Sequence, residues 1–385
     1  MMLITFWLCL ALICYVYLGY PILITTLGWL RQRHVRAGSI YPEVSLIVCA
    51  YNEADVIGRK IENCLSLQYP ADLLEVIVVN DGSTDGTQEV LKQYADRPGV
   101  KILDSPFRQG KAAAMNRAAA VAKGEVFVFS DARAIYRVDS LKKLVRNLRD
   151  PEVGCVNGNR TLYKNKSPIF GSERSYWSYE AYIKTMETQC GSTVSVSGAM
   201  IAIRASLFEP IPANLILDDT YLALQTLRKG FRVVYEPAAI CFQSSASSTR
   251  DEALRRQRIT AGRFQMLFNA RELWPWNDKF AIFELLSHKI MRLFLPFFSA
   301  GLFVSSAALV LSPDTPEMAL LVFEGQLIFG ILALGGWISE KFGWNLGFLG
   351  ISYYIASGNL ASLSGFIRYS KGRHTVLWEK ARRAE

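Results

Sequence analysis

The sequence predicts an α/β protein in which a doubly wound, mostly parallel sheet is inserted between an N-terminal transmembrane helix and a C-terminal helical membrane region. Three observations support this fold class. Short runs rich in β-branched residues alternate with helical stretches between residues 42 and 250. Hydrophobic residues make up 51% of the 385 residues, which exceeds the usual share in soluble domains. The excess lies in long apolar stretches near both ends of the chain.

The first 30 residues form the clearest apolar stretch. Residues 1–30 contain no charged side chain and are long enough to cross the roughly 30 Å hydrocarbon core of a bilayer. They lack the basic start and the small-residue cleavage site of a signal peptide, so we expect a retained anchor. The basic cluster at residues 31–36 predicts that the domain at residues 42–250 lies in the cytoplasm.

The segment 42–250 alternates between strand-like and helix-like patterns. Each predicted strand is short and rich in Val, Ile or Leu. The predicted strands are residues 44–50, 74–80, 100–104 and 125–130, and the predicted helices are residues 54–67, 84–94, 111–122 and 138–149. This order is typical of a parallel sheet with helices on both faces.

Residues 251–291 are predicted to form amphipathic helices at the membrane surface. Arginines alternate with apolar side chains at residues 254–267, a composition typical of the lipid–water interface. An aromatic-rich stretch at residues 176–183 suggests the same location. The alternatives are a solvated basic face for the first stretch and a buried core helix for the second.

The C-terminal membrane region is predicted at residues 292–367. It contains three apolar stretches, at residues 293–312, 318–339 and 342–367. If all three crossed the bilayer, the basic tail at residues 368–385 would lie outside, against the positive-inside tendency. We therefore expect three spans in all, with the glycine-broken third stretch in the interface or re-entering, and a multi-pass protein of the inner (plasma) membrane.

Charge and cysteine usage narrow the possible functions. The formal net charge of +9 suits an anionic leaflet and anionic substrates such as nucleotide diphosphates. Nucleic acid is a poorer fit, because the basic residues cluster beside apolar segments. The seven cysteines include no CxxC pair, so nothing indicates disulfides or zinc. Neither a GxGxxG motif after a strand nor a GxxxxGK[ST] loop is present.

Polar side chains follow three of the predicted strands. Asn52 and Glu53 follow the first strand, Asp81 the second and Asp131 the fourth. Because the carboxyl ends of parallel strands meet at one edge of a sheet, we expect these side chains to converge on a ligand site. Any one carboxylate alone is more typical of a turn cap. An Asp at such an edge can, however, hold Mg²⁺ or Mn²⁺ that bridges diphosphate oxygens.

With these motifs, the chain resembles membrane-anchored family 2 glycosyltransferases with the GT-A fold. That group includes bacterial exopolysaccharide glycosyltransferases and, more distantly, hyaluronan, chitin and cellulose synthases. The resemblance covers roughly residues 42–270, and the motifs occur in the family's order. It implies a GT-A catalytic domain that uses a nucleotide-sugar donor.

The resemblance implies a donor site with a metal ion. Asp131 matches the first Asp of the family's DxD metal motif, and Lys111 matches the segment near the diphosphate. Arg133 replaces the second Asp, which leaves Asp131 to bind Mg²⁺ or Mn²⁺ with water and phosphate oxygens. Arg133 is then a candidate contact of the diphosphate or of an anionic sugar or acceptor. The implied donor residues are Ala50, Tyr51, Asn52, Glu53, Asp81, Lys111, Asp131 and Arg133.

The resemblance also implies a catalytic base and an acceptor site. Asp218 and Asp219 match an acidic pair whose second member takes the acceptor proton, although without the other motifs such a pair is more typical of a helix N-terminus. Arg258 matches the central Arg of the QxxRW motif of processive members, and the Gln and the Trp of that motif are absent here. The implied acceptor residues are Ser197, Gly198, Arg204 and Arg258.

These matches imply an inverting enzyme that moves one sugar from a nucleotide donor, with UDP as the expected nucleotide, to a lipid-linked or growing glycan at the cytoplasmic membrane face. Its expected place is exopolysaccharide or cell-surface glycan synthesis, with polysaccharide assembly proteins as partners. One alternative is a processive polysaccharide synthase. Another is a non-catalytic glycosyltransferase-like subunit of a polysaccharide secretion complex, suggested by the substituted DxD and QxxRW positions.

Overall fold

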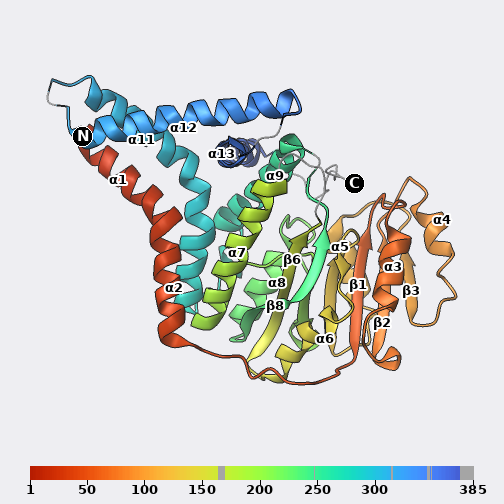
Figure 1. Cartoon of the computed structure of the whole chain (residues 1–385). Helices are drawn as coiled ribbons and strands as arrows, with labels where there is room; N and C mark the ends of the chain where they lie inside the picture. Colours follow the sequence, from red (N-terminus) through yellow and green to blue (C-terminus); the bar gives the residue numbers. More distant parts are fainter. Residues whose placement is uncertain (164–169, 247, 314, 345–346, 348, 373–385) are drawn as a thin grey trace.

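The structure is a computed structural model, and it describes residues 1–163, 170–246, 248–313, 315–344, 347 and 349–372. Apolar helices form one part of the molecule, and an α/β domain forms the other (Figure 1). Most of the basic tail predicted at residues 368–385, including the segment from residue 373 onward, lies outside the described residues.

The α/β domain is built on an eight-stranded mixed sheet of order β3-β2-β1-β4-β7-β6-β8-β5. The first four strands in this order are parallel, β7 runs antiparallel to both of its neighbours, β6 and β8 are parallel, and β5 is antiparallel to β8. The strands are β1 Val44–Ala50, β2 Leu74–Asn80, β3 Val100–Asp104, β4 Val126–Asp131, β5 Ile135–Tyr136, β6 Val153–Leu162, β7 Ile201–Arg204 and β8 Arg232–Gln243. The predicted mostly parallel α/β sheet is therefore confirmed.

Helices cover both faces of the sheet, as the doubly wound pattern predicts. One face packs on α5 and α8 through Ala114, Met115 and Leu222, and the other packs on α3 and α6 through Ile61 and Leu144. The helices are α3 Ile57–Leu65, α4 Thr87–Lys92, α5 Lys111–Ala119, α6 Ser140–Val145 and α8 Asp218–Arg228. The first four of these helices are shorter than predicted because turns or short 3-10 segments take up their first or last residues.

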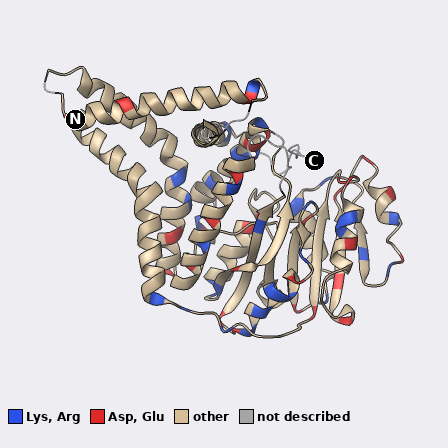
Figure 2. Cartoon of the chain, in the orientation of Figure 1, with Lys and Arg blue, Asp and Glu red and all other residues tan. Residues whose placement is uncertain are grey.

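Three helical segments are long and apolar enough to cross a membrane: Met2–Arg31, Lys279–Val310 and Glu317–Lys341. The first segment contains one charged residue, Arg31, whereas the second and third contain four Asp, Glu, Lys or Arg residues each, coloured red and blue in Figure 2. They comprise α1 Met2–Cys14, the π-helical turn Tyr15–Gly19, α2 Tyr20–Arg31, α10 Lys279–Glu284, the π-helical turn Leu285–Ile290, the short helix Met291–Phe294, α11 Leu295–Val310 and α12 Glu317–Lys341. The second segment begins at Lys279, so it includes residues that the sequence assigned to interface helices.

The last apolar stretch differs from these three segments. It forms α13 Leu349–Ser370, which packs along α9 Thr249–Asn269 and against α12. A Cβ on Gly365 would lie 2.7 Å from the backbone oxygen of Gln257, so this close packing requires glycine. Among the described residues α13 is not one of the helices that qualify as candidate spans by length and composition. The number of membrane passes stays a prediction.

The aromatic-rich stretch belongs to α7 Phe170–Cys190, which lies between α2 and the sheet (Figure 1). Ile183 and Met186 pack against Tyr20 and Ile24 of α2. Of the predicted stretch at residues 176–183, Ile183 is therefore buried in the core, whereas Tyr182 is 45% exposed. The interfacial location of this stretch stays a prediction.

Candidate active site

A cluster of three aspartates surrounds one lysine at the carboxyl edge of the sheet. Lys111 begins α5 directly after Gly110, whose φ of +98° suits glycine. Its ammonium donates to Asp131 Oδ1 at 2.9 Å and lies 3.1 Å from Asp218 Oδ2. Gly198 donates its backbone N–H to Asp219 Oδ2 at 3.1 Å. The structure thus brings together residues from four separate parts of the sequence.

The electrostatics of this cluster separate the roles of its carboxylates. Burial opposes ionisation of Asp131, but the charge and hydrogen bond of Lys111, with help from Gln243, lower the pKa of Asp131 to about 2. Burial and the neighbouring charge of Asp218 raise the pKa of Asp219 above its ordinary value. Asp131 is therefore suited to remain an anion, and Asp219 to accept a proton.

Asp81 organises the loop that carries Lys111. Its two carboxylate oxygens accept the backbone N–H groups of Gln109 and Gly110, each at 2.8 Å. The backbone N–H of Asp81 donates in turn to the carbonyl of Ala50 at 2.9 Å. These two predicted donor residues thus shape the site through main-chain contacts.

The loops after β1 and β2 are tied together by Asn52. Its φ is +54°, its side-chain oxygen accepts the N–H of Thr84 at 2.8 Å, and its own N–H donates to Ser83 Oγ at 2.9 Å. Beside it, the guanidinium of Arg108 lies 3.8 Å from the centroid of the Tyr51 ring. This pair offers a flat surface beside the loop that carries Asn52.

Arg133, which occupies the place of the second metal-motif aspartate, forms ion pairs within the protein. Its guanidinium lies 2.7 Å from Glu53 Oε2 and 2.7 Å from Asp55 Oδ2. Burial opposes the charge of Arg133, but these two carboxylates outweigh it and raise the pKa of Arg133. Arg133 and Glu53 therefore neutralise each other's charge beside the site.

The structure places the two predicted acceptor arginines, Arg258 and Arg204, in different parts of the domain. Burial lowers the pKa of Arg258, and the negative charges of Asp218, Asp219 and Asp131 partly oppose that shift. The Arg258 guanidinium therefore lies close enough to these carboxylates to interact with their charge. Arg204 instead donates to the carbonyls of Val153, Leu148 and Asp150.

Arg204 pairs with Val126, the first residue of β4, at the opposite edge of the sheet from the cluster. We therefore leave Arg204 out of the acceptor site.

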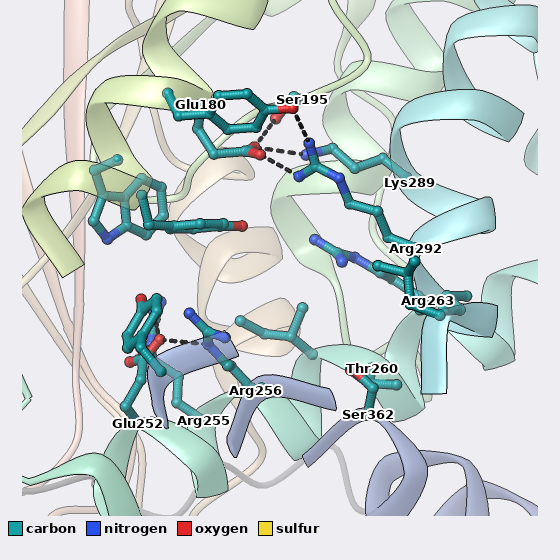
Figure 3. Close-up of a pocket in the computed structure, with 18 of the residues that line it drawn as sticks. Glu180, Ser195, Glu252, Arg255, Arg256, Thr260, Arg263, Lys289, Arg292 and Ser362 are labelled. Carbon is teal, nitrogen blue, oxygen red and sulfur yellow. Dashed lines mark hydrogen bonds and ion pairs between the residues drawn. The ribbon is translucent and has the colours of Figure 1, made fainter. Parts of the chain in front are cut away.

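A cavity of about 490 Å³ extends from Asp219 and Ser197 toward the membrane helices (Figure 3). It lies between α7, α9 and α13 and the short helix before α11. The sequence indicated the arginines of residues 254–267 but not that they line a cavity, and it gave no indication for Lys184. The additional polar lining residues include Lys184, Ser195, Thr220, Glu252, Arg255, Arg256 and Arg263.

The residues present fit a divalent cation held through one carboxylate. No group of three His, Cys, Asp or Glu side chains suited to a metal occurs among the described residues. The Asp131 side chain, however, is 39% exposed and supplies hard oxygen ligands. Mg²⁺ in particular is often held by one or two carboxylates together with substrate phosphates and water.

A mostly parallel mixed sheet with acidic side chains at its carboxyl edge is typical of the GT-A fold. Residues 45–211 match the profile of the family described as "Glycosyl transferase family 2". The chain therefore carries a glycosyltransferase family 2 domain, as the sequence motifs predicted.

Curated relatives extend this assignment. The chain is 26% identical over 256 residues to the poly-beta-1,6-N-acetyl-D-glucosamine synthase of Staphylococcus aureus strain MSSA476, which covers 65% of this chain and 61% of that protein. It is 26% identical over 255 residues to the enzyme of the same name from Staphylococcus epidermidis, covering 64% and 61%. The match thus spans about three fifths of the relatives' length.

A solved structure supports the fold. The mannosyltransferase PcManGT from Pyrobaculum calidifontis, in complex with GDP-Man and Mn²⁺, superimposes with a TM-score of 0.69 at 21% sequence identity. The superposition covers 96% of this chain and all of that one. The similarity therefore includes the helices outside the α/β domain.

Proposed function

We propose that the protein is a metal-dependent, inverting glycosyltransferase that moves a sugar from a nucleotide-sugar donor to an acceptor bound in the cavity. The observation that carries this proposal is the position of Asp219. Asp219 has a raised pKa, lies beside the Lys111–Asp131 cluster, and lines the cavity that leads to the membrane helices. A base in this position can reach an acceptor in the cavity while the donor binds on the side of Lys111 and Asp131.

The proposed reaction is a single displacement. An acceptor hydroxyl oxygen attacks the anomeric carbon of the donor sugar, and Asp219 takes the hydroxyl proton as the new carbon–oxygen bond forms. The bond from the anomeric carbon to the diphosphate breaks, and the nucleoside diphosphate leaves with the bonding electrons. The Lys111 ammonium lies where it can neutralise part of that charge.

Asp131 is the residue that would hold Mg²⁺ or Mn²⁺. When bound, the metal supplies Lewis-acid neutralisation of diphosphate charge. Within the protein, Gln243 donates to Asp131 Oδ2 at 3.2 Å and fixes the carboxylate on the side opposite Lys111. Asp131 therefore has a fixed orientation before any ligand arrives.

We infer the donor, the membrane face and the biological context from the names of the relatives and from the charge pattern of the sequence. We propose a UDP-linked hexose or N-acetylhexosamine because the relatives are N-acetylglucosamine synthases by name. We propose that the α/β domain lies in the cytoplasm because basic residues follow the first apolar segment. A lipid-linked or growing glycan is then the acceptor, in cell-surface glycan synthesis.

A processive synthase is the second candidate, favoured by the names of the relatives. Against it, Ile259 stands where processive members carry a Trp, and an aliphatic side chain offers no flat face to an acceptor sugar. The length of the product made by purified protein distinguishes the two. The non-catalytic alternative has less support, because Asp131, Asp218 and Asp219 are all present and clustered around Lys111.

The test is release of free nucleoside diphosphate from a panel of UDP-sugars and GDP-mannose by the full chain in detergent, with membrane lipid extract as acceptor source. Turnover of one donor that requires Mn²⁺ or Mg²⁺ and stops on chelation supports the proposal. Asp96→Asn, a change at an exposed site away from the cluster, is the matched control and should retain activity. Absence of turnover with every donor refutes the transferase function.

A further inference from the structure

The cavity beside Asp219 contains more positive than negative charge. Six cationic side chains line it, against the three carboxylates of Glu180, Glu252 and Asp219. The cations are Lys184, Arg255, Arg256, Arg263, Lys289 and Arg292. The lining therefore has an excess of three positive charges when all of these groups are ionised.

Four of the cations are held by carboxylates within the protein. Lys289 and Arg292 both pair with Glu180, and Arg255 and Arg256 both pair with Glu252. Figure 3 shows Glu180 and Glu252 on opposite sides of the cavity. In each group, the carboxylate neutralises part of the charge of its two cations. These four cations therefore do not require a ligand.

The other two cations differ. No carboxylate in the described part of the chain lies within 4.0 Å of Arg263 or Lys184. Arg263 extends into the open centre of the cavity (Figure 3). Lys184 is only 3% exposed, and its ammonium donates to Asn157 Oδ1 at 3.2 Å and lies 4.6 Å from the centroid of the Tyr235 ring.

A cation in such a position is costly unless an anion joins it. Taking a charge out of water without a partner is unfavourable, and the usual compensation is a counter-charge. Burial lowers the pKa of Lys184 to about 8 and also lowers the pKa of Arg263. An incoming anion would therefore stabilise the charged form of each group.

Part of the cavity lining is apolar and comes from the apolar helices near the two ends of the chain. Leu295 begins α11 within the second apolar segment, Ile351 and Ile355 belong to α13, and Tyr17 lies in the π-helical turn of the first segment. A ligand that fills the whole cavity must therefore combine an anionic head with a hydrocarbon portion.

We propose that this cavity binds a phosphate-bearing amphiphile, with the phosphate paired to Arg263 and its hydrocarbon chain along Leu295, Ile351 and Ile355. Resting on the proposed function, we further infer that this amphiphile is the acceptor, with its reactive hydroxyl at Asp219. A phosphate or diphosphate matches the excess of three positive charges better than a single carboxylate does. The planar guanidinium of Arg263 also matches phosphate geometry.

The test is equilibrium binding of radiolabelled dodecyl phosphate to the full chain in dodecyl maltoside micelles, without any donor. Dodecanol supplies the chain alone as a competitor, and inorganic phosphate supplies the anion alone. Arg263→Gln removes the charge, Arg263→Lys keeps it, and Arg97→Gln removes one exposed charge far from the cavity. The unfolding temperature of each variant shows whether it is folded.

We expect dodecyl phosphate to bind at least about tenfold more tightly than either competitor. A charge-assisted contact predicts that Arg263→Gln weakens binding about 10- to 100-fold, while Arg263→Lys loses less and Arg97→Gln loses nothing. Wild-type affinity in a folded Arg263→Gln variant overturns the proposal. Equal binding of dodecanol, or equal competition by inorganic phosphate, also overturns it.

Because the binding assay needs no donor, its failure is distinct from failure of the proposed function. Binding that depends on Arg263, together with no turnover of any donor, leaves the amphiphile site standing and refutes its role as the acceptor site. Turnover of a donor without binding that depends on Arg263 supports the transferase and refutes the amphiphile site.

Discussion

Replacing Asp219 with Asn is the most direct perturbation of the proposed mechanism, because the two side chains have nearly the same shape. Asp219 Oδ2 accepts the N–H of Gly198 at 3.1 Å, and Oδ1 accepts the N–H of Thr220 at 2.7 Å. An Asn can keep only one of these contacts, since its NH₂ group donates. The lost hydrogen bond is expected to cost about 1–2 kcal/mol of stability.

The expected catalytic effect is much larger than the structural one. Loss of a positioned general base lowers rates by about 10²- to 10⁴-fold. This corresponds to about 3–5 kcal/mol of activation free energy. Binding of the nucleotide sugar should change little, because Lys111 and Asp131 remain in place.

The assay measures nucleoside diphosphate release against donor concentration and pH for wild type and Asp219→Asn. Because burial and Asp218 raise the pKa of Asp219, the acid limb of the wild-type profile should lie above the ordinary aspartate pKa of about 3.9. Activity is present above the folded-state pKa and is lost as the pH falls through it. A variant that keeps more than a tenth of the wild-type kcat, or the same acid limb, refutes Asp219 as the base.

Three further predictions concern the surrounding charges. Asp218→Asn removes a like charge from Asp219, so the acid limb of the rate profile should move to lower pH. Asp131→Asn should reduce metal-dependent turnover at least about 100-fold, and titration calorimetry should show loss of Mn²⁺-dependent donor binding. The same change should cost about 1 kcal/mol of unfolding free energy at neutral pH, discounted for an exposed carboxylate. That stabilisation is present above pH 4 and is lost toward pH 2, because the folded pKa is depressed. Arg133→Ala removes the cation held by Glu53 and should lower the unfolding free energy by about 1–3 kcal/mol in denaturant titrations; an unchanged midpoint contradicts that pairing.

The sequence predicted the parallel half of the sheet well because its strands are short, apolar and followed by polar turns. The bounds of β1, β2 and β3 match the predicted residues. The strands β6 and β8 were not predicted. Asn157, Gly158 and Asn159 interrupt the apolar pattern of β6, and Pro237 lies in β8 where the register of the pair shifts.

The sequence predicted the site residues that lie at strand ends. It did not predict those whose position depends on packing between elements far apart in the sequence. Asp131 and Lys111 converge as the strand-exit rule and the family resemblance implied. Arg204 was misplaced because β7 runs antiparallel to β4, which puts Gly198 at the active edge and Arg204 at the other. The position of Lys184 depends on α7 packing between α2 and the sheet, which no local pattern specifies.

The arrangement of the two halves of the site favours inversion over retention. Lys111 and Asp131 mark the side on which a diphosphate would leave, whereas the cavity approaches Asp219 from the membrane helices. A single displacement needs its nucleophile opposite the leaving group, and a base on the nucleophile's side satisfies this requirement. Retention would require either a second carboxylate that forms a covalent intermediate or a nucleophile arriving on the leaving-group side. Asp218 is the nearest candidate, but its ion pair with Lys111 directs its charge toward the leaving-group side. The anomeric configuration of the first product, determined by NMR, is therefore expected to be opposite to that of the donor.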